Sequence, residues 1–173
     1  MKNFFIDSDI DEIITRTQDI LEQFSNKHIV LTGGRGFLGR YLTEIFFKYN
    51  EHLDKPIKLT VIDNLVVSGE LGNLWPNYNN FKFIKSDASK KIDLGKDVDF
   101  IVHAAGIASP FYYRLKPLET LDVAVNGMRN VLNFASENNA KVIFFSSSEI
   151  YGDPDPKFVP IKESYRGNVN TMG

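Results

Sequence analysis

Cysteine is absent from the 173-residue sequence, which excludes disulfide bonds and thiolate metal sites. This absence is typical of proteins in a reducing compartment, and we expect a cytoplasmic location. Histidine is also rare, with three copies in the chain. They stand at 28, 52 and 103, without the spacing of metal ligands, so we expect no metal site.

Long apolar runs and a large excess of charge are absent as well. No apolar stretch approaches the ~18 residues that a membrane-spanning helix needs, and the N-terminus lacks a signal-peptide pattern. The formal net charge is −2 and the sequence pI is about 5.9, which argues against a basic surface for nucleic acid or anionic membranes. We therefore expect neither nucleic acid nor a membrane as a partner. The chain length fits one domain.

Four of the twelve glycines stand in one short segment, residues 28–39. An apolar run at 29–31 predicts a buried strand, and it leads directly into a glycine-rich loop and then a helical pattern. Such a loop lets a diphosphate lie against the N-terminus of the helix. The glycines stand at 33, 34, 36 and 39.

Each of three glycines has a physical role in this interpretation. Gly33 supplies a tight turn, Gly36 has no side chain to block a pyrophosphate, and Gly39 lets the helix lie close to the strand. The Gly-x-x-Gly-x-x-Gly spacing differs from the commonest dinucleotide fingerprint. A glycine-rich turn without a ligand therefore remains the alternative.

An acidic residue at the end of the next predicted strand supports a dinucleotide. Asp63 ends an apolar run that begins at Lys58, and it comes 24 residues after Gly39. A carboxylate there can hold the adenosine ribose hydroxyls and repel a 2′-phosphate, which favours NAD over NADP. Arg35 in the loop points toward NADP, and an aspartate that only caps a helix is the alternative for Asp63.

Small residues end a further apolar run, residues 99–103. Ala104, Ala105 and Gly106 follow it, and small side chains let a cofactor lie against the backbone. All three signals stand at the carboxyl ends of predicted strands, where ligands bind in open α/β sheets.

The order of predicted elements gives the fold class. Strands that alternate with helices predict an α/β fold with a doubly wound parallel sheet, Rossmann-like and NAD-binding. We expect an added amphipathic helix at 1–26, opened by a capping box of Ser8 and Asp11, and an NAD-binding domain at 27–150. The predicted strands are 28–32, 57–62, 81–84, 98–103 and 141–146, and the predicted helices are 36–49, 117–138 and shorter pieces after Asp63 and Asp87.

The last segment, residues 151–173, has no periodicity and predicts an irregular loop. A compact domain rarely ends in such a tail, so the chain looks truncated before a substrate domain. Just before it, Ser146, Ser147, Ser148 and Glu149 follow the last predicted strand. Their hydroxyls and carboxylate could orient a substrate hydroxyl, and a solvated serine-rich turn is the alternative.

Residues 28–173 resemble the extended short-chain dehydrogenase/reductase family of nucleotide-sugar epimerases, dehydratases and decarboxylases. Within this family the chain is most similar to the UDP-glucuronate decarboxylases, because of the segments 108–113, 149–154 and 165–170. The matching motifs are Thr32-Gly-Gly-Arg-Gly-Phe-Leu-Gly39, Ile62-Asp-Asn64, Asp87, His103-Ala-Ala-Gly106 and Ser146-Ser-Ser-Glu-Ile-Tyr-Gly-Asp-Pro154.

The resemblance implies NAD as the cofactor, a nucleotide sugar (a UDP-sugar) as the substrate and a homodimer as the full-length assembly. Ser147 corresponds to the family's catalytic Ser or Thr, and Glu149 to an active-site Glu of the decarboxylases. Ser109, Tyr113 and Ser148 would lie near the sugar. The implied cofactor residues are Gly33, Gly36, Phe37, Leu38, Asp63, Asn64, Asp87, Ala104, Ala105 and Gly106.

The same comparison separates the reactions. The 4,6-dehydratases resemble Thr-Asp-Glu at 147–149, whereas this chain has Ser148 in the middle, which argues against dehydration. The 4-epimerases usually lack an acid at 149, which argues against epimerisation. Decarboxylation after oxidation at carbon 4 needs no acid for a leaving group. Epimerase and dehydratase remain the alternatives.

The family's Tyr-x-x-x-Lys pair is missing after the last predicted strand. Tyr78…Lys82 and Tyr112…Lys116 match its spacing, but neither opens a helix after that strand, so we reject both. We therefore expect this chain alone to be inactive and, without the partner helix of the dimer, to self-associate. A short dinucleotide-binding module without catalysis is the non-enzyme alternative.

Overall fold

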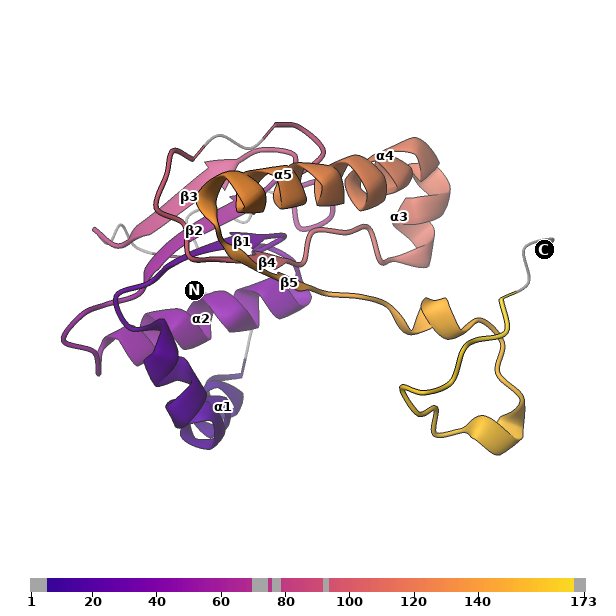
Figure 1. The fold of residues 1–173 in the computed structure, drawn as a ribbon, viewed down its shortest axis with the longest axis horizontal. Coiled ribbons are helices and arrows are strands. Elements are labelled where there is room, and N and C mark those ends of the chain that lie inside the picture. The colour runs from indigo at the N-terminus through magenta and orange to yellow at the C-terminus, as the bar shows by residue number, and fades with distance from the viewer. Residues whose placement is uncertain (1–5, 70–74, 76–78, 92–93, 170–173) are drawn as a thin grey trace.

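A five-stranded parallel sheet forms the centre of the fold (Figure 1). The structure is a computed structural model, and it describes residues 6–69, 75, 79–91 and 94–169. The strand order is β3-β2-β1-β4-β5, so the predicted doubly wound parallel sheet is confirmed. The strands are β1 His28–Thr32, β2 Lys58–Asp63, β3 Phe81–Lys85, β4 Phe100–His103 and β5 Lys141–Phe144.

The central strands are apolar because both of their faces are covered. All five residues of β1 are buried, as expected for a parallel strand between two helical layers. β5 lies at the edge of the sheet, and Ile143 and Phe144 there are 46% and 53% exposed. The strand positions agree with those predicted, with shorter ends in the structure.

Helices cover both faces of the sheet. α2, Phe37–Asn50, packs with α1 over one face, and α5, Met128–Asn138, covers the other (Figure 1). The first face contains a cluster built around Leu31, Phe46 and Val61, and the second a cluster around Val30, Ile101 and Val131. Neighbouring residues of β1 therefore enter opposite cores, as the pleat of a strand requires.

The N-terminal helix α1 spans Asp7–Leu21 and is followed by a short 3-10 turn, Glu22–Phe24. The predicted capping box is wrong, since Ile6 is the N-cap residue and no side chain caps the helix. Ser8 lies inside the first turn instead. An amphipathic helix can pack on its own domain or on a partner, and here its apolar residues pack on the domain, with Ile10 and Leu21 in the core.

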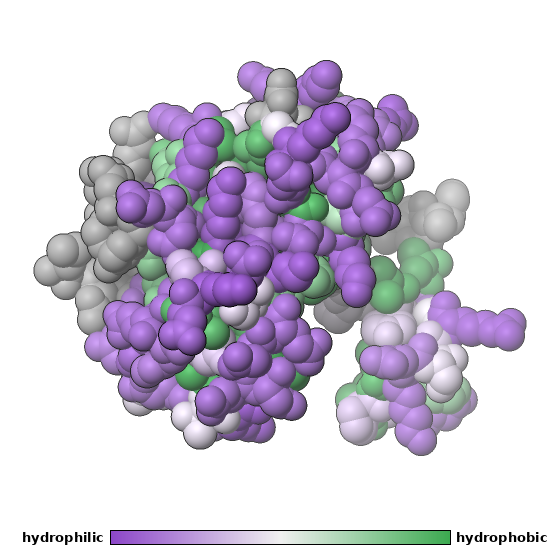
Figure 2. Space-filling view, turned by 60° about the vertical axis from the view of Figure 1, so that its left-hand side comes forward, coloured by the Kyte–Doolittle hydropathy of each residue, from purple (hydrophilic) through white to green (hydrophobic). Residues whose placement is uncertain are grey.

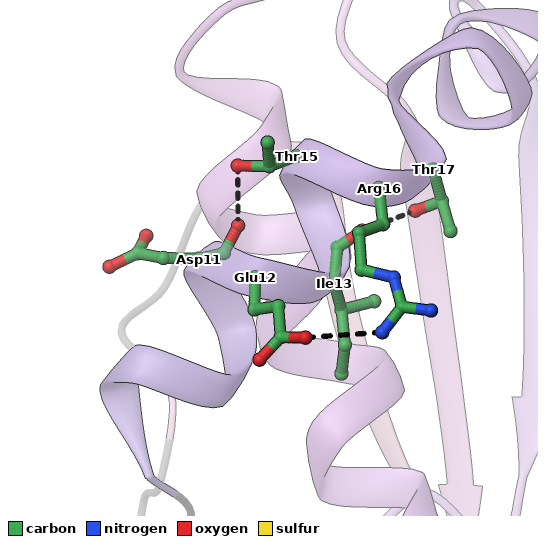
Figure 3. A network of polar contacts seen from close by, with 6 residues as sticks. All are labelled: Asp11, Glu12, Ile13, Thr15, Arg16 and Thr17. Carbon is green, nitrogen blue, oxygen red and sulfur yellow. Dashed lines mark hydrogen bonds and ion pairs between the residues drawn. The ribbon is translucent and has the colours of Figure 1, made fainter.

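α1 bends at Thr17, whose φ of −125° and ψ of 18° depart from helical values. The Thr17 hydroxyl donates to the carbonyl of Ile13 at 2.7 Å, and the Thr15 hydroxyl to that of Asp11 at 2.8 Å (Figure 3). Back-bonded threonines of this kind bend helices. The ion pair of Glu12 with Arg16 is exposed and contributes little to stability.

Two tyrosines of α2 attach α1 to the domain. The Tyr49 hydroxyl donates to Oε2 of Glu22 at 2.9 Å, and the Tyr41 hydroxyl donates to Oδ2 of Asp9 at 3.1 Å. Because α2 also begins at the glycine-rich loop, the added helix braces the element that carries the predicted pyrophosphate site.

The predicted long helix at 117–138 is present as one helical stretch with a change of pitch. α4, Pro117–Asp122, continues through a π turn at Val123–Gly127 into α5. One further helix, α3 at Pro110–Leu115, was not predicted. Where short helices were expected after Asp63 and Asp87, the described residues form turns, and residues 70–74, 76–78 and 92–93 lie outside the described ones.

The segment after β5 holds together mainly through its own contacts. It contains two 3-10 turns, Ser148–Tyr151 and Pro156–Phe158, and a bridge between Gly152 and Asn168. The Tyr165 ring lies 4.9 Å from that of Phe158, measured between centroids. Figures 1 and 2 show the segment standing clear of the sheet and its helices, and the face of the domain that is turned to the viewer in Figure 2 is mostly hydrophilic. The irregular structure predicted for this segment is confirmed for its described part.

No helix in the described ranges combines the length and apolarity that crossing a bilayer requires.

A buried histidine anchors the amino end of β1. His28 is 6% exposed, and its Nδ1 lies 3.1 Å from the carbonyl of Asp97. Since a carbonyl only accepts, Nδ1 carries the proton, and Nε2 accepts from the Thr60 hydroxyl at 2.9 Å. Burial, aided by the charge of Lys58, lowers the pKa of His28 below 6.5. Burial also lowers the pKa of His103.

We predict that α1 contributes to the stability of the whole domain. Ile10 is 1% exposed, whereas Ile20 of the same helix is 52% exposed. Ile10→Ala leaves a cavity and should lower the free energy of unfolding by about 2–5 kcal/mol, and Ile20→Ala should change it by less than about 1 kcal/mol. Urea unfolding of the two variants is the measurement, and equal effects would contradict the prediction.

The two histidines predict a loss of stability in acid. A folded-state pKa below the unfolded value means that the unfolded chain binds protons more readily, so stability falls as the pH drops below about 6.5. Urea unfolding between about pH 8 and about pH 5 should show a shallower decline for His28→Gln than for the wild type. Exposed His52 provides the control variant His52→Gln, whose decline should match the wild type. Parallel declines in all three proteins would refute the assignment to His28.

Candidate functional site at the carboxyl edge of the sheet

The glycine-rich loop is held close to the ends of β2 and β4. Gly33 has a φ of 74°, the left-handed region that favours glycine, and its amide donates to the Ile62 carbonyl at 2.8 Å. A Cβ at this position would lie 2.5 Å from the carbonyl oxygen of Ala104. The tight turn predicted at Gly33 is therefore present, and it contacts the backbone of the predicted Ala104–Gly106 segment.

Gly39 permits an equally close contact between α2 and the loop. A Cβ there would lie 2.6 Å from the Cα of Gly34 and would collide with the carbonyl of Gly33. Real Cβ atoms essentially never come within 3.0 Å of such atoms. Gly39 therefore brings α2 close to the loop that follows β1, whereas the prediction from the sequence was a close approach to the strand itself.

Gly36 is less crowded than Gly33 and Gly39, because a Cβ built on it would come within 4 Å of one atom only. It is the N-cap residue of α2, and the nearest atom to a Cβ built on it is the Gly33 carbonyl oxygen at 3.2 Å. The first amides of a helix have no intrahelical acceptor and carry partial positive charge. Phe37 and Leu38, which follow, are 68% and 50% exposed. The backbone cradle therefore fits an anionic diphosphate.

Asp63 ties this loop to the end of β2. Its Oδ2 accepts from the Arg35 amide at 2.9 Å, and its Oδ1 accepts from the Leu65 amide at 2.8 Å. The second bond caps a turn rather than the helix of the alternative interpretation. Carboxylate oxygens have further lone pairs, so these bonds fix the orientation of the group and leave it able to accept from ribose hydroxyls.

Asn64 and Asp87 join the loops after β2 and β3. The side-chain amide of Asn64 donates to Oδ2 of Asp87 at 3.1 Å. The backbone amide of Ser89 donates to Oδ1 of the same carboxylate at 2.8 Å. Burial raises the pKa of Asp87, but these hydrogen bonds outweigh it and bring the pKa below its usual value. Asp87 therefore stays ionised and can accept a hydrogen bond from an amino group.

A buried hydrogen-bond chain crosses from β1 to β4 beneath the loop. The Thr32 hydroxyl lies 2.7 Å from Nδ1 of His103 and 3.3 Å from the Ala105 amide. An amide only donates, so Thr32 accepts from Ala105, and the same hydroxyl shares a second hydrogen bond with the His103 ring, whose tautomer sets the direction of that bond. This chain fixes the backbone of Ala104 and Ala105, both of which are half-buried.

Arg35 does not extend into solvent from the loop. It is 4% exposed, and its Cζ lies 5.3 Å from the ring centroid of Phe83 and 5.5 Å from that of Trp75. Such contacts contribute on the order of 2 kcal/mol when desolvated. Burial lowers the pKa of Arg35, and the nearby carboxylate of Asp63 opposes this.

The predicted catalytic and sugar-binding residues form two local groups. Ser147 accepts from the Glu149 amide at 3.2 Å, and Ser147, Ser148 and Glu149 are all exposed. Ser109 is the N-cap of α3, and its carbonyl accepts from the Tyr113 amide at 3.0 Å. These groups follow β5 and β4, the two strands at one side of the sheet.

The structure gives no support to the rejected Tyr112…Lys116 pair. Tyr112 lies in α3, and the ammonium group of Lys116 is 3.8 Å from Oε1 of Glu119. Tyr78 of the other match lies outside the described residues. Among the residues that are described, no group of three or more His, Cys, Asp or Glu side chains could hold a metal ion.

Sequence reasoning missed the supporting residues of the site. The side chain of Asn130 in α5 donates to the carbonyls of Ala88 and Lys90, at 3.1 and 2.8 Å, and so holds the loop after Asp87. Thr32 and the rings around Arg35 were missed too. Each acts through partners more than 30 residues away, a relation that no local pattern encodes.

Comparison with known proteins gives a consistent result. Residues 29–172 match the NAD dependent epimerase/dehydratase family. UDP-glucuronic acid decarboxylase 6 of Arabidopsis thaliana is 35% identical over 151 residues, which cover 86% of this chain and 41% of the relative. The chain thus spans less than half the length of this relative.

Solved structures share the fold. A UDP-N-acetylglucosamine 4-epimerase from Methanobrevibacter ruminantium is 31% identical, with a TM-score of 0.65 over 84% of this chain and 45% of that one. A UDP-glucose 4-epimerase from Thermus thermophilus in complex with NAD is 20% identical, with a TM-score of 0.61 over 82% and 44%. The second likeness concerns the fold alone.

Proposed function

The chain belongs to the NAD dependent epimerase/dehydratase family, and we propose that it is the NAD-binding portion of an enzyme that modifies a nucleotide sugar. The single observation that carries the proposal is the side-chain-free cradle of Gly33, Gly36 and Gly39 at the N-terminus of α2. It lies beside a carboxylate, Asp63, that is oriented by two backbone amides.

The cradle and its neighbours would hold NAD along the carboxyl edge of the sheet. Gly33, Gly36, Phe37 and Leu38 would contact the pyrophosphate, and Asp63 with Asn64 the adenosine ribose. Asp87 would accept from the adenine amino group, and Ala104, Ala105 and Gly106 would lie beside the cofactor. Bound NAD supplies a hydride acceptor for carbon 4 of the sugar and later a hydride donor to the same carbon.

For the whole protein we propose decarboxylation of UDP-glucuronate. Ser147 would orient the 4-hydroxyl group of the sugar, and Glu149 would act beside it in the active site. Ser109, Tyr113 and Ser148 would position the sugar ring. Oxidation at carbon 4 makes the substrate a β-keto acid, which loses carbon dioxide without an acid catalyst for a leaving group.

The choice among reactions follows from Ser148 and Glu149 together with the relatives. Ser148 supplies no second acid for the elimination of water, and the Arabidopsis relative is a UDP-glucuronic acid decarboxylase. The 31% identical solved structure is a 4-epimerase, so nucleotide-sugar 4-epimerisation is the second candidate function. Glu149 favours the decarboxylase.

An exposed apolar stripe supports a homodimer. Along α4, the π turn and α5, apolar residues recur at intervals of three and four, the spacing of one helix face. Leu118, Leu121, Val125 and Leu132 of this stripe are between 48% and 72% exposed. Contiguous apolar surface of this kind marks protein interfaces, and a second copy of the same stripe would cover it.

NAD binding by the chain is the direct test of the proposed function. We expect calorimetric titration to show NAD binding to the wild type, and at least a tenfold loss for Gly36→Val, equal to about 1.4 kcal/mol, because the new side chain fills the cradle. Gly127→Ala is the matched control, since its Cβ would make an ordinary 3.5 Å contact with Val123.

Thermal unfolding of both glycine variants distinguishes blocked binding from loss of fold. A wild type that does not bind NAD would overturn the proposal. No turnover of UDP-glucuronate is expected from this chain alone, because its sequence contains no Tyr-x-x-x-Lys pair that opens a helix after β5.

Sedimentation tests the stripe. We expect the wild type to self-associate and Leu121→Glu to raise the dissociation constant at least tenfold, about 1.4 kcal/mol, because the stripe then buries a charge. Ile20→Glu is the control, since Ile20 is similarly exposed but lies on α1. A monomeric wild type at all accessible concentrations would count against the interface.

A further inference from the structure

A buried cation stands within the loop that we propose as the pyrophosphate site. Arg35 follows Gly34 and precedes Gly36, yet it is 4% exposed, whereas Phe37 is 68% exposed. An arginine near the adenosine ribose is the usual partner of the 2′-phosphate of NADP. The direction of the Arg35 side chain therefore bears on which dinucleotide the site accepts.

The Arg35 side chain is buried against the sheet and is not presented to solvent. Its guanidinium lies 5.3 Å from the ring centroid of Phe83, and Phe83 pairs with Val61 in the sheet, two residues before Asp63 on β2. Two residues of a strand span about 7 Å. The positive charge is thus buried in the layer between α2 and the sheet, where Phe83 packs, and the carboxylate of Asp63 is near enough to act on it.

Two aromatic side chains from separate parts of the chain, Trp75 and Phe83, contact the Arg35 guanidinium, and we call them the cage. Trp75 is 7% exposed and lies 5.5 Å from the Arg35 Cζ. Its indole nitrogen donates to Oε2 of Glu44 in α2 at 3.3 Å, which fixes the ring. Guanidinium groups stack well on aromatic faces because they are planar and weakly hydrated.

The backbone amide of Arg35 binds the carboxylate at the end of β2. This amide donates to Oδ2 of Asp63 at 2.9 Å, so Arg35 orients the ribose-binding carboxylate through its backbone while its guanidinium is buried on the two rings. A carboxylate at this position repels a 2′-phosphate. If the guanidinium turned toward the edge, it would offset that repulsion.

We propose that the cage of Trp75 and Phe83 sets the cofactor specificity of this chain by keeping the Arg35 guanidinium buried against two rings, where it cannot pair with a 2′-phosphate, so that NAD is selected over NADP. The inference rests on the proposed NAD-binding function. It assigns Arg35 as a positioning residue through its amide, and the two aromatic residues as specificity determinants that never touch the cofactor.

The test is the ratio of NADP to NAD dissociation constants, measured by calorimetric titration of the chain. Trp75→Leu opens the cage, and we expect it to shift this ratio at least tenfold toward NADP. Phe83→Leu, which removes the other ring, should shift the ratio in the same direction and serves if Trp75→Leu does not fold. Thermal unfolding establishes that each variant is folded.

The double variant Trp75→Leu with Arg35→Ala identifies the group responsible. If the released guanidinium binds the 2′-phosphate, the double variant should lose the gain in NADP affinity. A gain that persists without Arg35 would assign the effect to another cation, such as Lys85, which pairs with Asp63 in the sheet, and would overturn the proposal.

The outcomes separate the two proposals. A wild type that binds neither dinucleotide overturns the NAD-binding function and this inference with it. A wild type that binds NAD, with folded cage variants whose ratio is unchanged, overturns the inference alone. The sequence contains one tryptophan, so a change in its fluorescence in Arg35→Ala would provide an independent measure of the stacking.

Discussion

Backbone-to-backbone contact at the carboxyl edge is the constraint on which the rest of the site depends. The loop at Gly33 lies against the Ala104 carbonyl, and Gly39 brings α2 against the same loop. Any Cβ at these two positions would push the helix away from the sheet. The elements that follow β1, β2 and β4 meet within reach of one ligand because this contact is so close.

A single carboxylate extends that constraint to the second strand. Asp63 accepts one backbone bond from the glycine-rich loop and one from its own turn, so its two oxygens hold two segments in register. A second carboxylate links the loops after β2 and β3 in the same way, since Asp87 accepts hydrogen bonds from Asn64 and Ser89. These carboxylates therefore hold the loops in place before a ligand binds. Binding then costs less conformational entropy, because fewer loop residues must become ordered.

The sequence allowed the sheet and the helices next to it to be predicted, because buried parallel strands are continuous apolar runs and α2 has a clear helical period. The prediction of a capping box was wrong because it used only the local pattern of Ser8 and Asp11. The helix instead begins after Ile6, whose backbone amide donates to the Tyr41 hydroxyl of α2 at 3.3 Å. α3 was missed because six residues are too few to show a period. Strand ends predicted the glycine-rich loop, Asp63 and the segment 104–106 as cofactor sites, whereas Phe37, Leu38, Asn64 and Asp87 came from the family resemblance. The environment of the Arg35 side chain could not be predicted, since Trp75 and Phe83 are remote in sequence.

Arg35 shows why a residue type at a motif position is weaker information than the environment of its side chain. From the sequence, an arginine beside the ribose-binding aspartate favours NADP, and the aspartate favours NAD. In the structure the cation is stacked on Trp75 and on Phe83, the second of which packs against the core of the α2 face, and our proposal resolves the conflict in favour of NAD. The same long side chain can pair with a phosphate or cover apolar surface. Which of the two it does depends on the packing of neighbouring elements, here β3 and the residue Trp75 that precedes it.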